Sequence, residues 1–177
     1  MKKLHIDGMN IYLRDLRMAD ITDEYVNWLN SKKVNQFLES RFTRHDLQST
    51  KKYVKNSIEN PDLIFFAIIR KEGEKHIGNI KIGPIDRHHK TGPIGLMIGD
   101  KKSWGKGFAT EAIKAITEYA FNSLNLNKIH AGAYENNIGS IRAFEKAGFF
   151  VEGNRKNHCL YKNKAVNIVL LGKLRLK

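Results

Sequence analysis

The sequence lacks several features that mark particular classes of protein. It has one cysteine, Cys159, so no internal disulfide can form, which fits a reducing cytoplasm. No stretch approaches the roughly 18 consecutive apolar residues that a membrane-spanning helix needs. The basic start, residues 1–3, is followed by charged residues rather than by an apolar run, so no secretory signal is expected. We therefore expect a cytoplasmic protein that does not enter the membrane.

Proline and low-complexity sequence are also scarce. The 177 residues include three prolines, and no linker rich in Pro, Gly or Ser divides the chain. A chain of this length is about the size of one domain and can bury a substantial core. We therefore expect residues 1–177 to form a single domain. No set of His, Cys, Asp and Glu has the spacing of metal ligands, so no metal is expected.

Acidic residues are the scarcer charged type. The 31 Lys and Arg residues exceed the 18 Asp and Glu residues and give a formal net charge of +13. Such an excess attracts polyanions, including nucleic acid and phosphate-bearing small molecules, although a plain solvated surface is the alternative. The basic residues are dispersed and most aromatic residues fall at core positions, which argues against a nucleic-acid-binding face.

Hydrophobic periodicity predicts a mixture of strands and helices. The expected strands are residues 10–14, 63–69, 76–82, 93–98, 129–134, 149–152 and 165–171. The expected helices are residues 22–29, 34–38, 47–59 after an Asp46 cap, 106–124 and 138–147, the last one ended by Gly148. The strand–helix–strand unit from 93 to 134 implies one parallel crossover. We expect a mixed α/β fold with a central, mostly antiparallel sheet of about seven strands, one parallel junction and flanking helices, with a ligand at the junction.

A glycine-bearing loop leads from strand 93–98 into the long helix. Gly105 and Gly107 let the backbone approach a bulky anion, and the first N–H groups of a helix have no internal partner. Lys102 and Lys106 add positive charge beside the positive end of the helix dipole. The loop is therefore expected to hold a pyrophosphate, although the Gly-x-Gly pattern alone also suits a plain strand-to-helix turn. Trp104 borders this loop and is expected to pack in the core.

Two longer motifs resemble those of one enzyme family. Residues 104–112, WGKGFATEA, resemble the acetyl-CoA-binding motif of the GNAT superfamily of N-acetyltransferases, and residues 137–149, NIGSIRAFEKAGF, resemble its second motif one strand later. The pair looks closest to the RimJ/RimL-type subgroup, which also begins with a strand like residues 11–14. The resemblance covers nearly the whole chain. It implies acetyl-CoA as cosubstrate, an amine as acceptor, and a sheet whose parallel junction splays apart.

The resemblance also implies the contacts with acetyl-CoA. Backbone groups near Met97 and Ile98 would pair with the pantetheine amides. Asn137 would hydrogen-bond the CoA arm, and Ser140 would sit near the sulfur, although both residues could equally serve the N-terminus of their own helix. The family often has Gln or Arg where Lys102 stands. The residues expected to hold the pyrophosphate are Lys102, Gly105, Lys106, Gly107, Phe108, Ala109 and Thr110.

The resemblance leaves the acid and the base of the reaction open. In this family the amine usually attacks the thioester directly, and many relatives protonate the leaving thiolate with a tyrosine. Phe144 stands at that position and cannot donate a proton. The resemblance to the RimL-like subgroup implies a serine as the acid instead, and Ser140 fits that position. Glu135, at the end of strand 129–134, is the expected base, with a solvated carboxylate as the alternative. Glu39 is a second candidate.

Residues of the early helical region and of nearby loops are expected to bind the acceptor. Glu39 and Arg41 lie among aromatic residues, Asn79 lies in a strand that feeds the site, and His88 and His89 precede strand 93–98. The subgroup resembles acetyltransferases of amino-sugar nucleotides. The N-terminal amine of a ribosomal or other protein is the alternative acceptor, and a polyamine or aminoglycoside fits less well because acidic residues are few.

Two non-catalytic classes also remain open. The chain could be a basic nucleic-acid-binding module, or a regulatory protein that senses CoA without transferring an acetyl group. An edge strand near residues 165–171 could pair across a homodimer.

Overall fold

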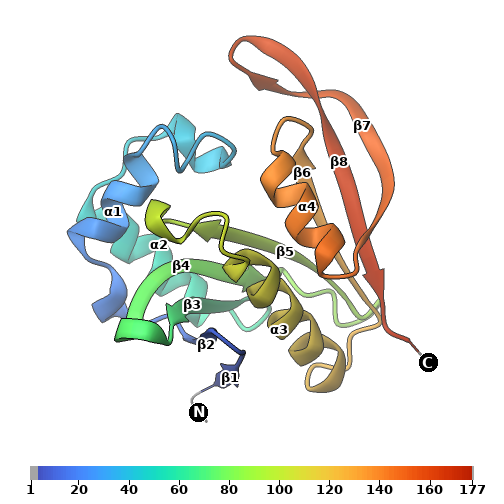
Figure 1. Ribbon diagram of the computed structural model, residues 1–177, viewed down its shortest axis with the longest axis horizontal. Coiled ribbons are helices and arrows are strands. Elements are labelled where there is room, and N and C mark those ends of the chain that lie inside the picture. The colour runs from blue at the N-terminus through green and yellow to red at the C-terminus, as the bar shows by residue number, and fades with distance from the viewer. Residues whose placement is uncertain (1–3, 177) are drawn as a thin grey trace.

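The computed structural model describes residues 4–176 and shows one eight-stranded sheet with helices on both faces (Figure 1). The strands are β1 (His5–Asp7), β2 (Ile11–Asp15), β3 (Ile64–Arg70), β4 (Lys75–Ile82), β5 (Thr91–Ile98), β6 (Lys128–Tyr134), β7 (Phe150–Tyr161) and β8 (Lys164–Leu174). The α-helices are α1 (Asp23–Asn30), α2 (Leu47–Glu59), α3 (Phe108–Asn122) and α4 (Ile138–Lys146). Short 3₁₀ turns are η1 (Met18–Asp20), η2 (Glu39–Phe42), η3 (Glu72–Glu74) and η4 (Lys101–Ser103). The strand order is β1-β2-β3-β4-β5-β6-β8-β7, which confirms the expected mixed α/β fold with one strand more than predicted.

The parallel pair β5–β6 holds together only where the two strands begin. Residues 91–93 pair with residues 128–130, and no pairing follows. Beyond this point β5 stays paired with β4 as far as Ile98, and β6 stays paired with β8 as far as Tyr134. The sheet is therefore split between the C-terminal ends of β5 and β6. We call this region the β5–β6 split.

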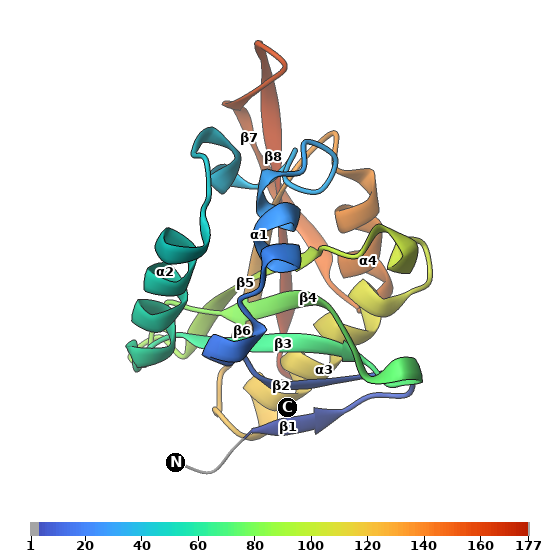
Figure 2. The same ribbon diagram turned by 90° about the vertical axis from the view of Figure 1, so that its left-hand side faces the viewer.

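Two apolar layers fix the sheet in place, one on each face. On one face, Tyr25 and Trp28 of α1 and Val54 of α2 pack against Ala67 and Ile69 of β3 (Figure 2). On the other face, α3 and α4 pack on the sheet through a larger core that includes Ile11, Phe66, Ile80, Ile113, Ile116 and Phe144. Burying one such side chain contributes about 1.5–3 kcal/mol to the free energy of unfolding. The strands on both sides of the split are therefore held on a rigid scaffold.

Several helix boundaries follow the local sequence signals. The Asp46 carboxylate accepts from the Ser49 amide at 2.7 Å and caps α2, which ends at Glu59 as expected. The helix α4 ends just before Gly148, whose φ of 86° is the left-handed conformation that glycine adopts easily. The helix α3 starts at Phe108 rather than at residue 106, because Gly107 is also left-handed.

The segment from 34 to 38 corrects a sequence prediction. It forms turns rather than a helix, and its side chains bond the end of α1 and the β7–β8 hairpin. The Asn35 amide donates to the Leu29 carbonyl at 2.7 Å, and Gln36 accepts from the Tyr161 hydroxyl at 3.0 Å. The Asn35 amide makes one i→i−4 bond to the Ser31 carbonyl at 2.9 Å, but the Val34 and Leu38 amides make the i→i−3 bonds of turns.

The C-terminal hairpin is longer than the sequence indicated. The strand predicted at 149–152 continues to Tyr161 as β7, and with β8 it projects beyond the rest of the sheet (Figure 1). Within residues 4–176, no helix combines the length and the apolar character that a membrane crossing requires.

Candidate active site

The loop between η4 and α3 is open and lined with backbone donors. Gly105 and Gly107 have φ values of 74° and 84°, and a Cβ atom on either residue would meet nothing within 4 Å. Within residues 4–176, the six amide groups of residues 105–110 donate to no other residue. Six unpartnered N–H groups at the positive end of a helix form a binding site for an anion. Lys102 and Lys106 are exposed beside them.

A buried carboxylate holds the loop from below. Asp100 is 8% exposed, accepts from the Ser103 hydroxyl at 2.7 Å and lies 3.6 Å from the Lys75 ammonium. Burial works to raise the pKa of Asp100, but the Ser103 hydrogen bond and the Lys75 charge outweigh it, so the pKa lies below its ordinary value. Trp104 is 42% exposed, which corrects the expectation of a core residue.

Glu111, in the first turn of α3, points away from the loop. Its carboxylate accepts from the backbone N–H of Asn10 at 2.7 Å and of Ile11 at 3.1 Å. The acidic residue of the motif therefore fastens α3 to the turn between β1 and β2. The Glu111 carboxylate is therefore hydrogen-bonded to this turn and not to the loop.

The edge of β5 offers further backbone groups at the split. In an antiparallel pair, every second residue bonds the neighbouring strand. The Gly99 amide donates to the Ile77 carbonyl of β4, so by this alternation Met97 also bonds β4, while Leu96 and Ile98 face the split. The Ile98 carbonyl accepts from the Trp104 indole at 2.8 Å. Met97 and Ile98 were both expected to face the pantetheine arm, but only the backbone of Ile98 points toward the split.

The start of α4 contributes Asn137 and Ser140. Asn137 caps the helix, and its side chain accepts from the Ser140 amide at 3.3 Å. The Ser140 hydroxyl has no hydrogen-bond partner within residues 4–176. Phe144 is 2% exposed and packs against Phe149, so it belongs to the core.

Tyr134, at the end of β6, was not predicted, and it organises a cluster with two residues that were. Its hydroxyl donates to the Glu39 carboxylate and accepts from the Arg41 guanidinium at 2.9 Å. Burial, together with the Glu39 carboxylate, raises the pKa of Tyr134 to about 12. Counting on from the β5–β6 register, Tyr134 is level with Met97 across the split. A tyrosine at the end of an apolar strand carries no sequence signal for this role, because its partners lie about a hundred residues away.

Glu135 follows Tyr134 but points to a structural partner. Its two carboxylate oxygens accept from the backbone and side-chain N–H groups of Asn167, both at 2.9 Å. The Glu135 amide in turn donates to the Asn167 carbonyl. The carboxylate expected to act as base is therefore engaged in holding β8.

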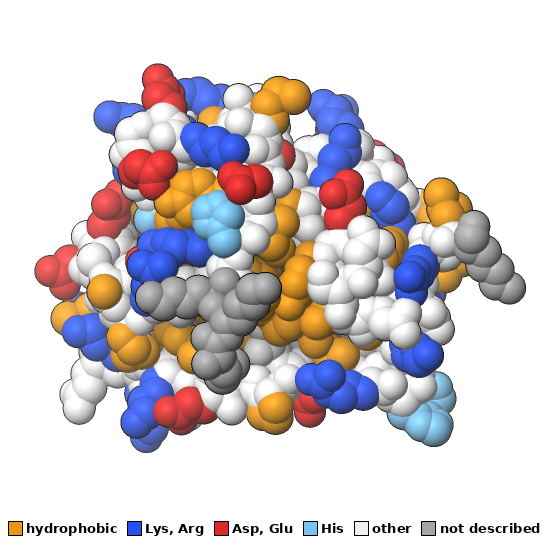
Figure 3. Space-filling view, turned by 90° about the horizontal axis from the view of Figure 1, so that it is seen from below, with side chains coloured by type: hydrophobic (Ala, Val, Ile, Leu, Met, Phe, Trp, Pro, Cys, Tyr) orange, Lys and Arg blue, Asp and Glu red, His pale blue; other side chains and the backbone are white. Residues whose placement is uncertain are grey.

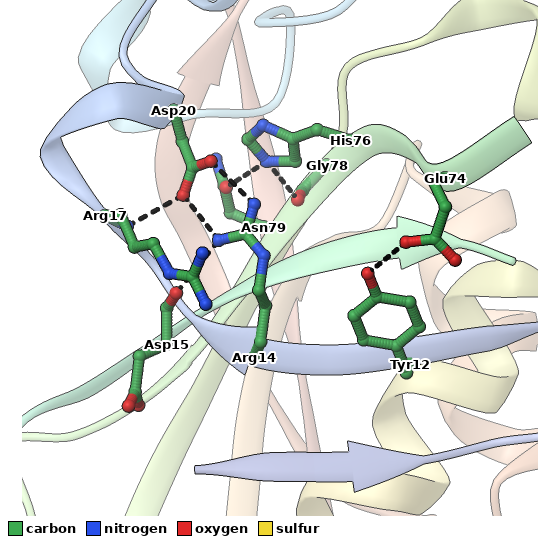
Figure 4. Close-up of polar contacts among 9 residues, drawn as sticks. All are labelled: Tyr12, Arg14, Asp15, Arg17, Asp20, Glu74, His76, Gly78 and Asn79. Atoms are coloured by element: carbon green, nitrogen blue, oxygen red, sulfur yellow. Dashed lines mark hydrogen bonds and ion pairs between the residues drawn. The ribbon is translucent and has the colours of Figure 1, made fainter. Parts of the chain in front are cut away.

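Asn79 lies one strand in from the split, opposite Met97, and the two loop histidines lie just before β5 begins. Asn79 is 4% exposed, and its side-chain oxygen lies 3.0 Å from the His76 ring nitrogen beneath α1 (Figure 4). His88 and His89 precede β5, which spans roughly 23 Å from its first to its last residue. The split opens at the far end of that strand. The Asn79 side chain is therefore held by a structural contact and His88 lies at the opposite end of β5 from the split, so a role of either residue in acceptor binding stays a prediction.

No metal centre accompanies these residues. Among residues 4–176, no group of three or more His, Cys, Asp or Glu side chains is placed to hold a metal ion.

Comparison with known proteins identifies the family. Residues 10–150 match the acetyltransferase (GNAT) domain family. The chain is 32% identical over 161 residues to the probable N-acetyltransferase YjcK of Bacillus subtilis, covering 86% of this chain and 87% of that protein.

Two solved structures share the fold at lower identity. The spermidine N-acetyltransferase of Vibrio cholerae, in complex with CoA and spermine, has a TM-score of 0.84 at 20% identity and covers 93% of this chain and 95% of its own. RimL, a ribosomal L7/L12 α-N-protein acetyltransferase in complex with CoA, has a TM-score of 0.86 at 15% identity, with coverage of 97% and 98%.

Fold and site together define an acyltransferase. The chain belongs to the GNAT family of acetyltransferases.

Proposed function

We propose that the chain transfers an acetyl group from acetyl-CoA to a primary amine. The observation that carries this proposal is the open loop of six unpartnered amide groups beside the β5–β6 split. A pyrophosphate fits such a loop because each N–H can donate to an anionic oxygen, with Lys102 and Lys106 adding charge. The backbone of Leu96 and Ile98 would pair with the pantetheine arm like an added strand.

The reaction needs a proton acceptor for the amine and a proton donor for the thiolate. The amine nitrogen bonds to the acetyl carbon, the carbon–sulfur bond breaks, and the amine loses a proton. We assign the acceptor role to Glu39, whose carboxylate meets Tyr134 level with the end of the split, rather than to Glu135, which is held by Asn167. Ser140, with its hydroxyl unpartnered among residues 4–176, is the proposed donor to sulfur. The serine hydroxyl then regains a proton from solvent, and Glu39 releases the amine proton to solvent.

We further propose an acceptor that carries negative charge, in keeping with a RimJ/RimL-type enzyme that acts on an amino-sugar nucleotide. The net charge of +13 supports an anionic acceptor and disfavours a polyamine, even though a spermidine acetyltransferase shares the fold. The N-terminal amine of a protein, as the RimL neighbour uses, is the second candidate.

The non-catalytic alternatives have less support. On the face shown in Figure 3, Lys and Arg side chains are scattered among other types rather than gathered in a block. A nucleic-acid-binding surface usually concentrates its basic residues.

The test of the cofactor assignment is a calorimetric titration with acetyl-CoA. Gly107→Glu places bulk and negative charge against the six amides, and we expect it to weaken binding at least a hundredfold, since it replaces attraction by repulsion. Gly73→Glu is the matched control. Gly73 has a similar φ of 74° and an open environment in an exposed turn, so this variant adds the same charge and backbone strain elsewhere.

The two variants separate the loop from general effects. Equal affinity for Gly107→Glu and Gly73→Glu would contradict the assignment of the loop. A screen for thiol release over amino-sugar nucleotides, N-terminal peptides and polyamines then identifies the acceptor, and binding without release on any amine would favour the CoA-sensing alternative.

A further inference from the structure

An open hollow of about 560 Å³ lies beside the Tyr134 cluster, lined by the loop after α1 and by the tip of the β7–β8 hairpin. This volume falls within the range of small-molecule sites. The residues that line it are Asn30, Lys32, Asn35, Gln36, Arg41, Phe42, Thr43, Arg44, Tyr161 and Lys162. Three separate segments of chain contribute, and none of the lining residues is part of either motif of the sequence.

The charge of this hollow is of one sign. Four of its lining residues are basic, and none is acidic. Within residues 4–176, Lys32, Arg44 and Lys162 have no carboxylate within ion-pair distance. Cations that share a hollow without a counter-charge repel one another, and an anionic ligand relieves that repulsion.

The walls of the hollow are built before any ligand arrives. Asn30 exchanges two hydrogen bonds with the backbone of His45, at 2.8 and 3.0 Å, and Gln36 accepts from Tyr161. Lys162 occupies a two-residue turn in which both residues have positive φ, the favoured connection for a hairpin. Lys32, Arg44 and Lys162 are thus carried on fixed backbone, and the Lys162 ammonium lies 5.3 Å from the Tyr161 ring centroid. The fixed backbone lowers the entropic cost of binding.

An aromatic surface accompanies the charge. The Phe42 side chain is 70% exposed at the rim of the hollow, and Tyr161 lines its other side. An aromatic ring exposed to water is unfavourable in free energy, and stacking on a planar base removes its face from water. A ligand with a phosphate group and a planar ring would contact both the basic and the aromatic side chains of this lining.

Arg41 connects the hollow to the reaction site. It lines the hollow, and its guanidinium also donates to the Tyr134 hydroxyl at 2.9 Å and to the Leu160 carbonyl at 3.0 Å. A molecule held by its anionic end in the hollow would therefore extend its other end toward Tyr134 and Glu39.

We infer that this hollow is a binding subsite for the nucleoside diphosphate portion of the acceptor, with Lys32, Arg44 and Lys162 as its phosphate contacts. The inference rests on the proposed acetyl transfer and specifies where the acceptor is recognised. A polycation is excluded from the same place by the repulsion of four basic side chains.

The test is a titration with UDP, performed on protein saturated with CoA so that the α3 loop is occupied. We expect micromolar binding that weakens about tenfold in Arg44→Glu and about tenfold in Lys162→Glu, because each variant loses one charge-assisted contact. Lys114→Glu, on the exposed side of α3, makes the same change in net charge and should bind UDP like the unaltered protein.

Separate titrations keep this inference distinct from the proposed function. Binding of CoA itself reports on the α3 loop, and UDP can also be titrated into Gly107→Glu, where that loop no longer accepts phosphate. Absence of UDP binding would overturn the subsite. An equal loss of UDP affinity in Arg44→Glu, Lys162→Glu and Lys114→Glu would overturn it too. So would spermine binding that strengthens in Arg44→Glu, or binding of single-stranded RNA with no binding of UDP.

Discussion

Tyr134 and Glu39 show how single side chains outside the family motifs complete the site. Neither motif contains them, yet the Tyr134 hydroxyl joins Glu39 and Arg41 at the end of β6. Ser140 is part of the second motif, and its role as the acid stays a prediction. The sequence named Glu39 and Ser140 as candidates, but it did not indicate Tyr134, whose partners are brought to it by the fold.

At this scale we predict separate effects of Glu39→Gln and Ser140→Ala. An amide cannot take a proton from the amine, so Glu39→Gln should lower kcat/KM for the acceptor about a hundredfold. Ser140→Ala should lower kcat by about tenfold while acetyl-CoA affinity stays within twofold, because a hydroxyl that acts on the leaving thiolate matters only in the transition state. Steady-state kinetics and the acetyl-CoA titration measure both quantities.

Glu135→Gln is the comparison for the loss of a carboxylate. Glutamine keeps one oxygen for Asn167, so the expected effect is a small loss of unfolding free energy rather than of kcat/KM. A hundredfold loss of kcat/KM in this variant, with Glu39→Gln unimpaired, would return the base to Glu135.

At the scale of elements, the contact between α3 and the β1–β2 turn sets the direction of the helix that carries the loop. Glu111 accepts from the Asn10 and Ile11 amides across a separation of about a hundred residues. A Cβ atom on Gly8 would lie 2.4 Å from the Glu111 carboxylate, so the turn fits closely around it. The first turn of α3 therefore has one fixed position.

We predict that Glu111→Gln lowers the unfolding free energy by about 1–3 kcal/mol, since it removes the negative charge that accepts from the Asn10 and Ile11 amides and brings an amide donor to the side-chain N–H of Asn10. Glu118→Gln, at an exposed position of the same helix, should change it by less than about 0.5 kcal/mol. Urea unfolding of the two variants makes the comparison. Equal stability would show that the contact is dispensable.

The elements that the sequence predicted are those with local signals. Asp46 and Gly148 mark helix ends, and the apolar run of β3 marks a buried strand. The helix predicted at 34–38 was wrong because Asn35 is held by the end of α1 and Gln36 by Tyr161 of the distant hairpin. The strand β1 has three residues and no apolar alternation, and most of β7 is polar and exposed, so neither shows the period on which strand prediction depends.

The whole molecule contains buried titratable groups that limit its stability at both ends of the pH range. Burial lowers the pKa of His76 below its ordinary value of 6.5. The pKa of Asp20 is also lowered, because the Arg14 hydrogen bond outweighs the effect of burial (Figure 4). Burial raises the pKa of Tyr25 above its ordinary value of 10.0, and it raises that of Tyr134 to about 12.

We therefore predict a plateau of stability between about pH 6.5 and pH 10, the ordinary values for His76 and Tyr25. Below this plateau, His76 and Asp20 bind protons in the unfolded chain but stay unprotonated in the folded protein, so stability falls as the pH falls. Above it, tyrosines of the unfolded chain lose protons that folded Tyr25 and Tyr134 retain, so stability falls as the pH rises. Each proton of difference contributes a slope of about 1.4 kcal/mol per pH unit.

The alkaline limb can be assigned to its source by substitution. In Tyr25→Phe the main buried hydroxyl is gone, so the urea midpoint should fall less steeply above pH 10 than in the unaltered protein. Tyr12→Phe is the comparison. The raised pKa of Tyr12 rests first on its hydrogen bond to exposed Glu74, which solvent screens, so its removal should change the slope less. An identical alkaline slope in Tyr25→Phe and the unaltered protein would show that burial of this tyrosine does not control the limit.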